Sequence, residues 1–491
     1  MDKISGTHDS SYADESQVNG STKLRTSEKV VFGVGDFGAN YSWTFIASFI
    51  IIYMTDVVGI AGSVIGTIIL FCRFADGFSD IFMGSIIDNT NTKMGKAKPW
   101  VFWTAPVLGV LTFMLFNVPT SFSYTGQIAY IFIVYFLISV IFYTANNVAY
   151  SSLVSFMSKD EKDRISLGSI RFIFSNISVL CITTFTVYFV TSFGDNQQGW
   201  TYTSAIYALL CAIPLMITGY FVKERNVAEK QYREVKKTKR IPFSLIIKSL
   251  ITEKYFLITI VLYLLWYLRQ TDNSMRIYYA TYIFNDANVM AIMSIATLLP
   301  TILGLLVAPQ FAEKVGIKNS IIIGLIISII SYIMMGIFSE NLTLLVVGLI
   351  IHGIGLVPFT AALSGIVADV GDIIYWKTGV PVQGSIFSLA SAGMKIGSGL
   401  QSAIVGWSLS VGGYVAGASV QSQSTIFAIK SMQIYFPLLA VAIVTIFTLF
   451  LNYEKFIRHI KEQIRTNNVV EMRDKQLSKY NEGLLRQIEF M

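Results

Sequence analysis

The stretch Cys72–Trp100, CRFADGFSDIFMGSIIDNTNTKMGKAKPW, places an arginine and several acidic residues inside a long apolar run. Asp76 and Asp80 are four residues apart, so on a helix both carboxylates project from nearly the same face. A charge at membrane depth costs roughly 3 kcal/mol even on a lenient scale, and it seldom persists unless it pairs or binds something. The two carboxylates therefore predict a cation site. The alternative is an internal salt bridge, in which Arg73 reaches Asp76 one turn away.

The rest of the chain has the composition of a membrane protein. Of its 491 residues, 53% are hydrophobic and only 14% are charged. Apolar runs of about 20 residues, each long enough to cross roughly 30 Å of hydrocarbon as a helix, recur between short polar loops. These runs are continuous rather than alternating, so they predict helices and not a barrel. We expect about twelve spans, near residues 30–54, 63–88, 99–118, 126–157, 165–192, 201–222, 254–284, 288–309, 319–338, 343–368, 383–412 and 430–452.

The net charge of +7 is distributed unevenly among the loops. Basic residues cluster after the second, fourth, sixth and eighth apolar runs, whereas the alternate loops 117–127, 191–199 and 338–343 contain none. By the positive-inside rule, this asymmetry predicts a multi-pass protein of the cell membrane with both termini in the cytoplasm. The basic excess thus reflects topology, and we expect the lipid bilayer rather than nucleic acid as its partner.

A polar segment in the middle of the chain separates two similar parts. Lys93-Met-Gly-Lys-Ala-Lys follows the second run, and Lys314-Val-Gly-Ile-Lys follows the eighth. This short sequence repeat, at equivalent places in the two parts, fits the parallel repeat of the major facilitator fold. In that fold the substrate site lies near the midplane between the halves. We therefore predict an all-α membrane protein with a disordered tail 1–28, a six-helix half 29–222, a cytoplasmic loop 223–252, a second six-helix half 253–452 and a cytoplasmic tail 453–491 that starts as a helix.

Other polar residues fall near the middle of the apolar runs. Asn40 and Asn147 can either line a site or hold helices together. Arg171 and Lys395 are costlier to bury, so they either contact a ligand or form salt bridges to the acids of the second run. Thr144 lies one turn before Asn147 on the same face, where its hydroxyl could join a cation shell.

These motifs resemble the glycoside–pentoside–hexuronide:cation symporter family of the major facilitator superfamily, which includes melibiose permease. The resemblance begins with R-x-x-D-x-x-x-D, M-G-x-x-x-D and the G-K-x-[KR]-P-W loop of the opening stretch. It extends from about Phe32 to Leu451. Further matches are GVGDFGAN at 33–40, YMTDVVG at 53–59, ADVGDIIYWKTG at 368–379 and MKIGS around Lys395.

The resemblance implies a secondary active transporter that moves a sugar together with Na⁺ or H⁺ by alternating access, without a cofactor and without enzyme activity. Its cation-binding positions match Asp76, Asp80 and Thr144, with Ser79 where the family has an asparagine. Its substrate positions match Arg171 and Lys395. Two family carboxylates are replaced here by Asn40 and Asn147, and two sugar-stacking tryptophans are replaced by Ser151 and Thr360. The expected substrate residues are Asn40, Asn147, Ser151, Arg171, Ser391 and Lys395, and the expected gate or salt-bridge residues are Arg73, Asp369, Asp372 and Lys377.

The substrate class follows from these replacements. Loss of two carboxylates makes the expected site less negative, so we predict a neutral glycoside or pentoside. A hexuronide is the alternative, because the remaining cations could bind its carboxylate, and a lipid carrier of related fold is a more distant one. Some members of the family append a phosphotransferase-type regulatory domain after the last span, and the remaining chain is too short for one.

A second charged cluster falls in the seventh run. Arg269, Asp272 and Arg276 lie within WYLRQTDNSMRIYY. They could line the substrate cavity, or they could mark the outer end of the helix and pair with one another. We favour the second interpretation. A membrane enzyme or receptor would instead require a catalytic constellation or a large extramembrane domain, and the sequence has neither.

Overall fold

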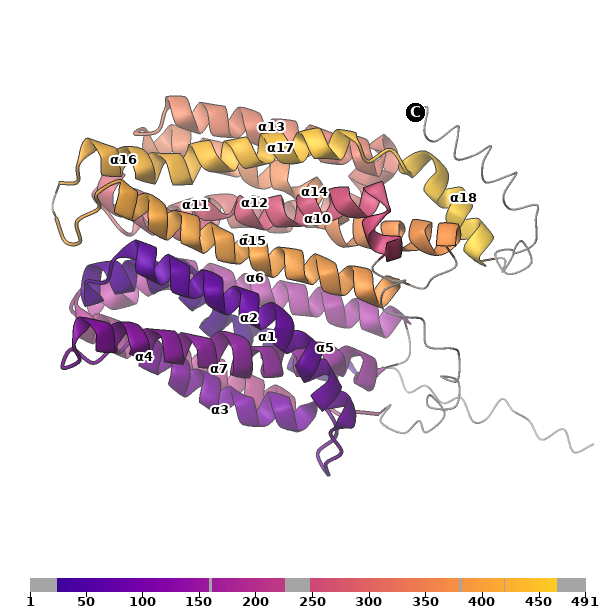
Figure 1. Cartoon of the computed structure of the whole chain (residues 1–491), viewed down its shortest axis with the longest axis horizontal. Helices are drawn as coiled ribbons and strands as arrows, with labels where there is room; N and C mark the ends of the chain where they lie inside the picture. Colours follow the sequence, from indigo (N-terminus) through magenta and orange to yellow (C-terminus); the bar gives the residue numbers. More distant parts are fainter. Residues whose placement is uncertain (1–23, 159–160, 226–247, 379–381, 419, 466–491) are drawn as a thin grey trace, which may run out of the picture.

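The computed structural model of the chain describes residues 24–158, 161–225, 248–378, 382–418 and 420–465. Figure 1 shows the N-terminal helices, indigo to magenta, beside the C-terminal helices, pink to yellow. The first half contains α1 (Thr26–Ile52), η2 (Tyr53–Val58), α2 (Gly62–Asn89), α3 (Lys98–Leu115), α4 (Tyr124–Phe136), η3 (Leu137–Phe142), α5 (Tyr143–Met157), α6 (Glu161–Ser192) and α7 (Gln197–Phe221).

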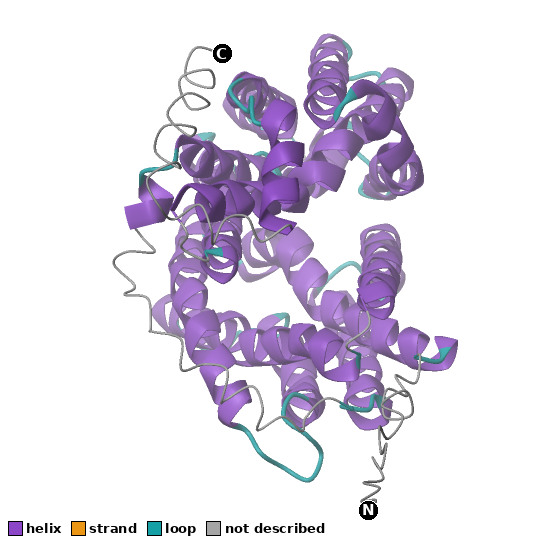
Figure 2. Cartoon of the chain, turned by 90° about the vertical axis from the view of Figure 1, so that its right-hand side faces the viewer, coloured by secondary structure: helices purple, strands orange, loops and turns teal. Residues whose placement is uncertain are grey.

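The second half is built in the same way. Figure 2, which views the molecule from one end, shows two groups of helices side by side. The elements are α10 (Lys254–Leu268), α11 (Thr271–Ile283), α12 (Val289–Val315), α13 (Ile317–Ile337), α14 (Leu342–Thr378), α15 (Gln383–Val411), α16 (Gln423–Lys430), η5 (Ser431–Tyr435), α17 (Phe436–Leu449) and α18 (Glu454–Arg465).

Helices occur at the places of all twelve predicted spans. Among the described residues, nine helices are long and apolar enough to cross a membrane. The three other predicted spans correspond to α2, to the pair α10 and α11, and to α15. The α18 helix confirms the helix predicted at the start of the C-terminal tail. Residues 1–23, 226–247 and 466–491, on which much of the tail and loop predictions fall, lie outside the described residues.

The predicted seventh span is interrupted. It consists of α10 and α11, which meet in a turn at Arg269 and Gln270. The N–H of Gln270 bonds to the carbonyl of Tyr267, three residues back rather than four, which tightens the last turn. The hydroxyl of Thr271 then donates to the carbonyl of Met432 in η5 at 2.8 Å. This break lies next to the charged cluster of the seventh run.

The starts of α3 and α13 show the internal repeat in atomic detail. The carboxylate of Glu224, just after α7, accepts backbone N–H groups of residues 96–98 at 2.8 Å. In the second half, Glu454 accepts the N–H groups of residues 317 and 318 at 2.7 and 3.0 Å. A carboxylate satisfies the free N–H groups and the positive end of a helix. The Lys93 and Lys314 echo therefore marks two structurally equivalent loops.

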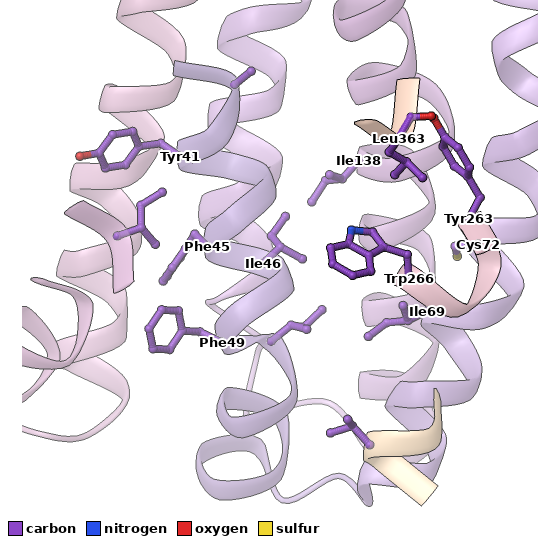
Figure 3. Packing of buried hydrophobic residues seen from close by; sticks show 14 of the residues in the cluster. Tyr41, Phe45, Ile46, Phe49, Ile69, Cys72, Ile138, Tyr263, Trp266 and Leu363 are labelled. Carbon is purple, nitrogen blue, oxygen red and sulfur yellow. The ribbon is translucent and has the colours of Figure 1, made fainter. Parts of the chain in front are cut away.

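The core of the first half is aromatic. Phe45 and Phe49 of α1 are fully buried, and Figure 3 shows both pointing to the same side of that helix. The ring of Phe45 stacks on Phe116 with centroids 4.0 Å apart and meets Tyr207 edge to face at 4.9 Å. Such ring pairs add about 0.5–1.5 kcal/mol beyond area burial. They fix the rotation of α1, and so determine which of its residues face the other half.

The two halves contact each other closely at one end of the bundle. We define the outer end as the end of the bundle at which α16 begins, on the left in Figure 1 and opposite α18. There the hydroxyls of Thr55 and Tyr278 are 2.8 Å apart, and the Tyr414 hydroxyl donates to Asp56 at 2.7 Å. Helices α2 and α15 meet backbone to backbone, because a Cβ at Gly406 would come within 2.1 Å of the Gly62 carbonyl oxygen. The outer end is closed.

Candidate functional site

A cavity of about 360 Å³ lies between the two halves. Its first-half wall comes from α1, α2, α5 and α6, and its second-half wall comes from α10, α11, α12 and α15. Of the residues predicted for the site, the cavity is lined by Arg73, Asp76, Asp80, Thr144, Asn147 and Lys395.

The centre of the cavity wall is a lysine shared by two carboxylates. Lys395 Nζ of α15 lies 2.9 Å from Asp76 Oδ1 and 2.5 Å from Asp80 Oδ2, both on α2. Asp76 is only 2% exposed, whereas the side chain of Asp80 is 31% exposed. The helical spacing thus brings both carboxylates to one face, as predicted. Their ammonium partner comes from the other half of the protein.

Hydroxyl oxygens complete the surroundings of Asp76. Thr144 Oγ1 donates to Asp76 Oδ1 at 2.6 Å, and Ser79 Oγ lies 3.3 Å from Thr144 Oγ1. The four residues predicted for the cation are therefore brought together, with oxygen atoms of the kind that hard cations prefer. No group of three His, Cys, Asp or Glu residues able to hold a metal occurs among the described residues.

Arg73 belongs to the same wall. Its Nη1 is 3.9 Å from Asp76 Oδ2, which is too long for a hydrogen bond. Its guanidinium instead lies over the ring of Trp43, 3.8 Å from the centroid, and that ring stacks on Tyr143 at 4.2 Å. The internal salt bridge considered for Arg73 is therefore weak compared with the bonds to Lys395. The carboxylates do form a salt bridge, but its main partner is Lys395 of the other half rather than Arg73 of the same helix.

The other predicted gate residues bind partners within the second half. Asp369 of α14 pairs with Lys461 of α18 at 2.6 Å, and Lys377 pairs with Glu253 at 2.9 Å. Asp372 lies between them on α14 and is half-buried. These contacts hold α14 to its neighbours at the end near the termini, and a gating role for the three residues stays a prediction.

A second polar group in the first half is centred on Asp36, which was not among the predicted site residues. Asp36 of α1 is 6% exposed and accepts a hydrogen bond from Arg171 Nε at 2.8 Å. Arg171 also donates to Ser151 Oγ at 3.0 Å and to Asn147 Oδ1 at 3.3 Å. Asn40 donates to the main-chain oxygen of Asp36 at 2.8 Å. Asp36 could have been predicted, because it is an acid inside the apolar stretch GVGDFGAN, one turn before Asn40.

The predicted substrate residues thus divide into two sets. Asn147 and Lys395 line the cavity. Asn40, Ser151 and Arg171 lie outside the cavity lining, and Arg171 joins them to it by its hydrogen bond to Asn147. Ser391 is half-buried on α15, one turn before Lys395, and is also outside the lining.

The charged cluster of the seventh run forms part of the second-half wall. Asp272 Oδ2 is 4.0 Å from Arg269 Nη1 and 3.7 Å from Arg276 Nη2. The pairing that we favoured is confirmed, but these residues are buried rather than placed at an exposed helix end. Arg276 also lines the cavity, beside Gln270, Asn273 and Ser274.

Comparison with known proteins identifies a sugar transport family and relatives named as transporters or carriers. The sequence profile of a family described as "MFS/sugar transport protein" matches residues 31–455. The chain is 27% identical over 432 residues to an isoprimeverose transporter of Lactiplantibacillus pentosus, covering 87% of this chain and 89% of the relative. It is 25% identical over 406 residues to a glucuronide carrier protein homolog of Escherichia coli (strain K12), covering 82% and 87%.

Solved structures share the fold. A crystal structure of a D-xylose-proton symporter matches with a TM-score of 0.60 at 15% identity, covering 87% of this chain and 97% of that chain. A crystal structure of the nucleoside transporter NupG matches with a TM-score of 0.60 at 17% identity, covering 87% and 99%.

Proposed function

This chain belongs to the MFS/sugar transport protein family, the glycoside–pentoside–hexuronide symporter family that its motifs predict, and from this premise we propose that it carries a sugar together with a cation by alternating access. One observation carries the proposal. Two carboxylates of α2 share the ammonium of Lys395 from α15 across the cavity between the halves. Known relatives and fold neighbours are transporters, which agrees with a protein that is not an enzyme.

The coupling follows from charge. Two neighbouring carboxylates do not both stay ionised in a buried site without a compensating cation. Lys395 supplies that cation in the present arrangement. When Na⁺ or a proton takes its place at Asp76 and Asp80, the ammonium is released toward the substrate. Ion and sugar then favour each other's binding, by reciprocal linkage. Ser79 and Thr144 add oxygen ligands when the ion is Na⁺.

The remaining wall suits a hydroxylated substrate. Gln270, Asn273, Ser274 and Gln401 give the second half amide and hydroxyl groups that face the cavity. These groups can both donate to and accept from sugar hydroxyls, whereas they match a lipid acyl chain poorly. A sugar is therefore the substrate, with a glycoside or pentoside as the class expected from the sequence and a hexuronide as the alternative.

Uptake into proteoliposomes tests the function. Purified protein is reconstituted and given labelled glycosides, pentosides and hexuronides, while Na⁺ and H⁺ gradients are imposed separately. At least one sugar is expected to accumulate above its outside concentration with one of the two gradients. Purified, folded protein that accumulates no sugar under either gradient contradicts the proposal, and movement of lysolipid instead supports a lipid carrier.

We further propose that the outer end faces away from the cytoplasm, because basic residues crowd the loops at the other end. Ser123 and Asn341 lie in loops at the outer end. A cysteine at either position, in a background without native cysteines, is expected to react with an impermeant reagent applied to intact cells. Labelling that occurs only after the cells are opened shows the reverse orientation.

Closure of the outer end is expected to depend on the glycine contact between α2 and α15. A valine at Gly406 cannot fit, since its Cβ meets the Gly62 carbonyl oxygen at 2.1 Å. Overpacking costs about 1–3 kcal/mol, so we expect the closed state to lose roughly 5- to 150-fold in population and transport to fall accordingly. A reporter at Ser48→Cys in the cavity lining should label faster from outside.

Gly365 provides the matched control for this substitution. It lies on α14 with no atom within 4 Å of an added Cβ. Gly365→Val should therefore leave transport and reporter labelling close to those of the unchanged protein. Equal rates for the Gly406 and Gly365 variants show that the outer contact does not limit transport.

A further inference from the structure

The buried cluster at the start of α11 carries more positive than negative charge. It contains Arg269 in the turn before α11, Asp272 and Arg276 on α11, all at most 4% exposed. Asp272 lies 4.0 and 3.7 Å from them, beyond hydrogen-bond range. Both the arginines and the aspartate keep buried polar atoms without a hydrogen-bond partner. These atoms are Nε of each arginine and Oδ1 of Asp272. One aspartate therefore compensates two cations only in part.

The neighbours of this cluster do not supply the missing charge. Arg276 donates to two neutral groups, Ser294 Oγ at 3.2 Å and Asn273 Oδ1 at 3.1 Å. Arg269 Nη1 lies 3.5 Å from His352 Nε2 and 3.5 Å from the Tyr332 hydroxyl, so its near neighbours here are an imidazole and a phenol rather than a carboxylate. Among the described residues, no other acid forms an ion pair with either arginine.

The rest of the cavity is balanced. In formal charge, the carboxylates of Asp76 and Asp80 equal the cations of Lys395 and Arg73, and next to the cavity Asp36 equals Arg171. The excess positive charge thus belongs to the cluster of Arg269, Asp272 and Arg276. An uncompensated buried charge costs several kcal/mol, unless a ligand neutralises it. Within the cluster, Arg276 lines the cavity and Arg269 does not. Arg269 adds to the positive potential at Arg276.

We propose that Arg276 is a specificity-determining residue that binds an anionic oxygen group of the substrate, such as the carboxylate of a sugar acid. The inference rests on the proposed sugar transport and refines its substrate class. The polar wall beside Arg276 binds the sugar hydroxyls, and the arginine fork binds the carboxylate, for which its geometry is suited. Cation uptake at Asp76 and Asp80 raises the positive charge of the cavity and so strengthens binding of the anion.

Paired ligands test this role in equilibrium binding to purified protein. Methyl β-glucuronide and methyl β-glucoside share a ring and differ in whether a carboxylate is present. The unchanged protein is expected to bind the glucuronide about 10-fold or more tightly. Arg276→Gln should bring the two affinities to within about 3-fold of each other, while Arg276→Lys should keep part of the difference. Should uptake identify a different ring, that sugar and its carboxylate analogue form the pair.

The controls separate this role from folding. Arg276→Gln leaves Arg269 and Asp272 as a balanced pair, so its thermal unfolding temperature is expected to equal or exceed that of the unchanged protein. Lys430→Gln removes a cation of the same half that pairs with Glu340 outside the cavity, and it should keep the full preference. A neutral sugar bound as tightly as its acid, or a preference that survives in Arg276→Gln, overturns the proposal and leaves sugar transport standing. Failure of all sugars to bind overturns the proposed function itself.

Discussion

Replacing Arg171 with glutamine is expected to weaken substrate binding strongly. Arg171 is held by Asp36, Ser151 and Asn147, and its fork of donors has N–H groups beyond those that these contacts use. Its side chain is 31% exposed, next to Asn147 on the cavity wall. A hydrogen bond to a charged group contributes about 1.5–3 kcal/mol, so the loss of one weakens binding by roughly 10- to 100-fold. Equilibrium binding of the transported sugar measures this.

A second variant separates binding from folding. Removing Arg171 alone leaves the buried carboxylate of Asp36 without a cation. Breaking a buried ion pair in this way lowers the free energy of unfolding by about 3–5 kcal/mol. The double variant Asp36→Asn with Arg171→Gln removes both charges and should recover stability. Binding should nevertheless stay lost in the double variant. Recovery of normal affinity there means that Arg171 only neutralises Asp36.

Spacing along one helix was readable from the sequence. The separation of Asp76 and Asp80 predicted a shared face, and the apolar runs predicted the depth of each polar residue. Lys395 was among few charges at membrane depth, so it could be named as a partner for the acids before its helix was placed. The echo between residues 93–98 and 314–318 likewise identified equivalent loops, which Glu224 and Glu454 cap in the same way.

The rotation of each helix and the pairing between helices could not be read in this way. Hydropathy gives the depth of a residue but not the direction in which its side chain points. The pairing of Arg171 with Asp36 and its hydrogen bond to Asn147 could therefore not be read from the sequence. Arg276 was expected to pair within its own helix, yet it also reaches the cavity. The break before Thr271 depends on a contact with Met432, far away in the sequence.

The second large effect is expected at the carboxylate pair. Asp80→Asn removes one of the two acids that hold Lys395, so the cation loses a ligand and its binding no longer affects that of the sugar. The substituted amide has almost the same shape, and Asp80 is partly exposed, so the fold should tolerate it. We expect sugar binding and exchange to remain, while accumulation falls to the equilibrium level. Asp76→Asn should behave alike, with a larger risk to stability because Asp76 is buried.

Glu340 supplies a matched control for both variants. It is an acid whose side chain is 76% exposed and pairs with Lys430 at 2.6 Å outside the cavity. Glu340→Gln should both exchange and accumulate sugar like the unchanged protein. A carboxylate pair that is only a structural ion pair would instead lower expression or thermal stability when either aspartate is changed.

The most direct measurement compares exchange with accumulation in one set of proteoliposomes. Labelled sugar is followed with and without an imposed cation gradient for the unchanged protein, Asp76→Asn, Asp80→Asn and Glu340→Gln. Cation coupling through Asp76 and Asp80 predicts that all four exchange sugar and that only the unchanged protein and Glu340→Gln concentrate it. Wild-type accumulation by both aspartate variants would contradict that assignment.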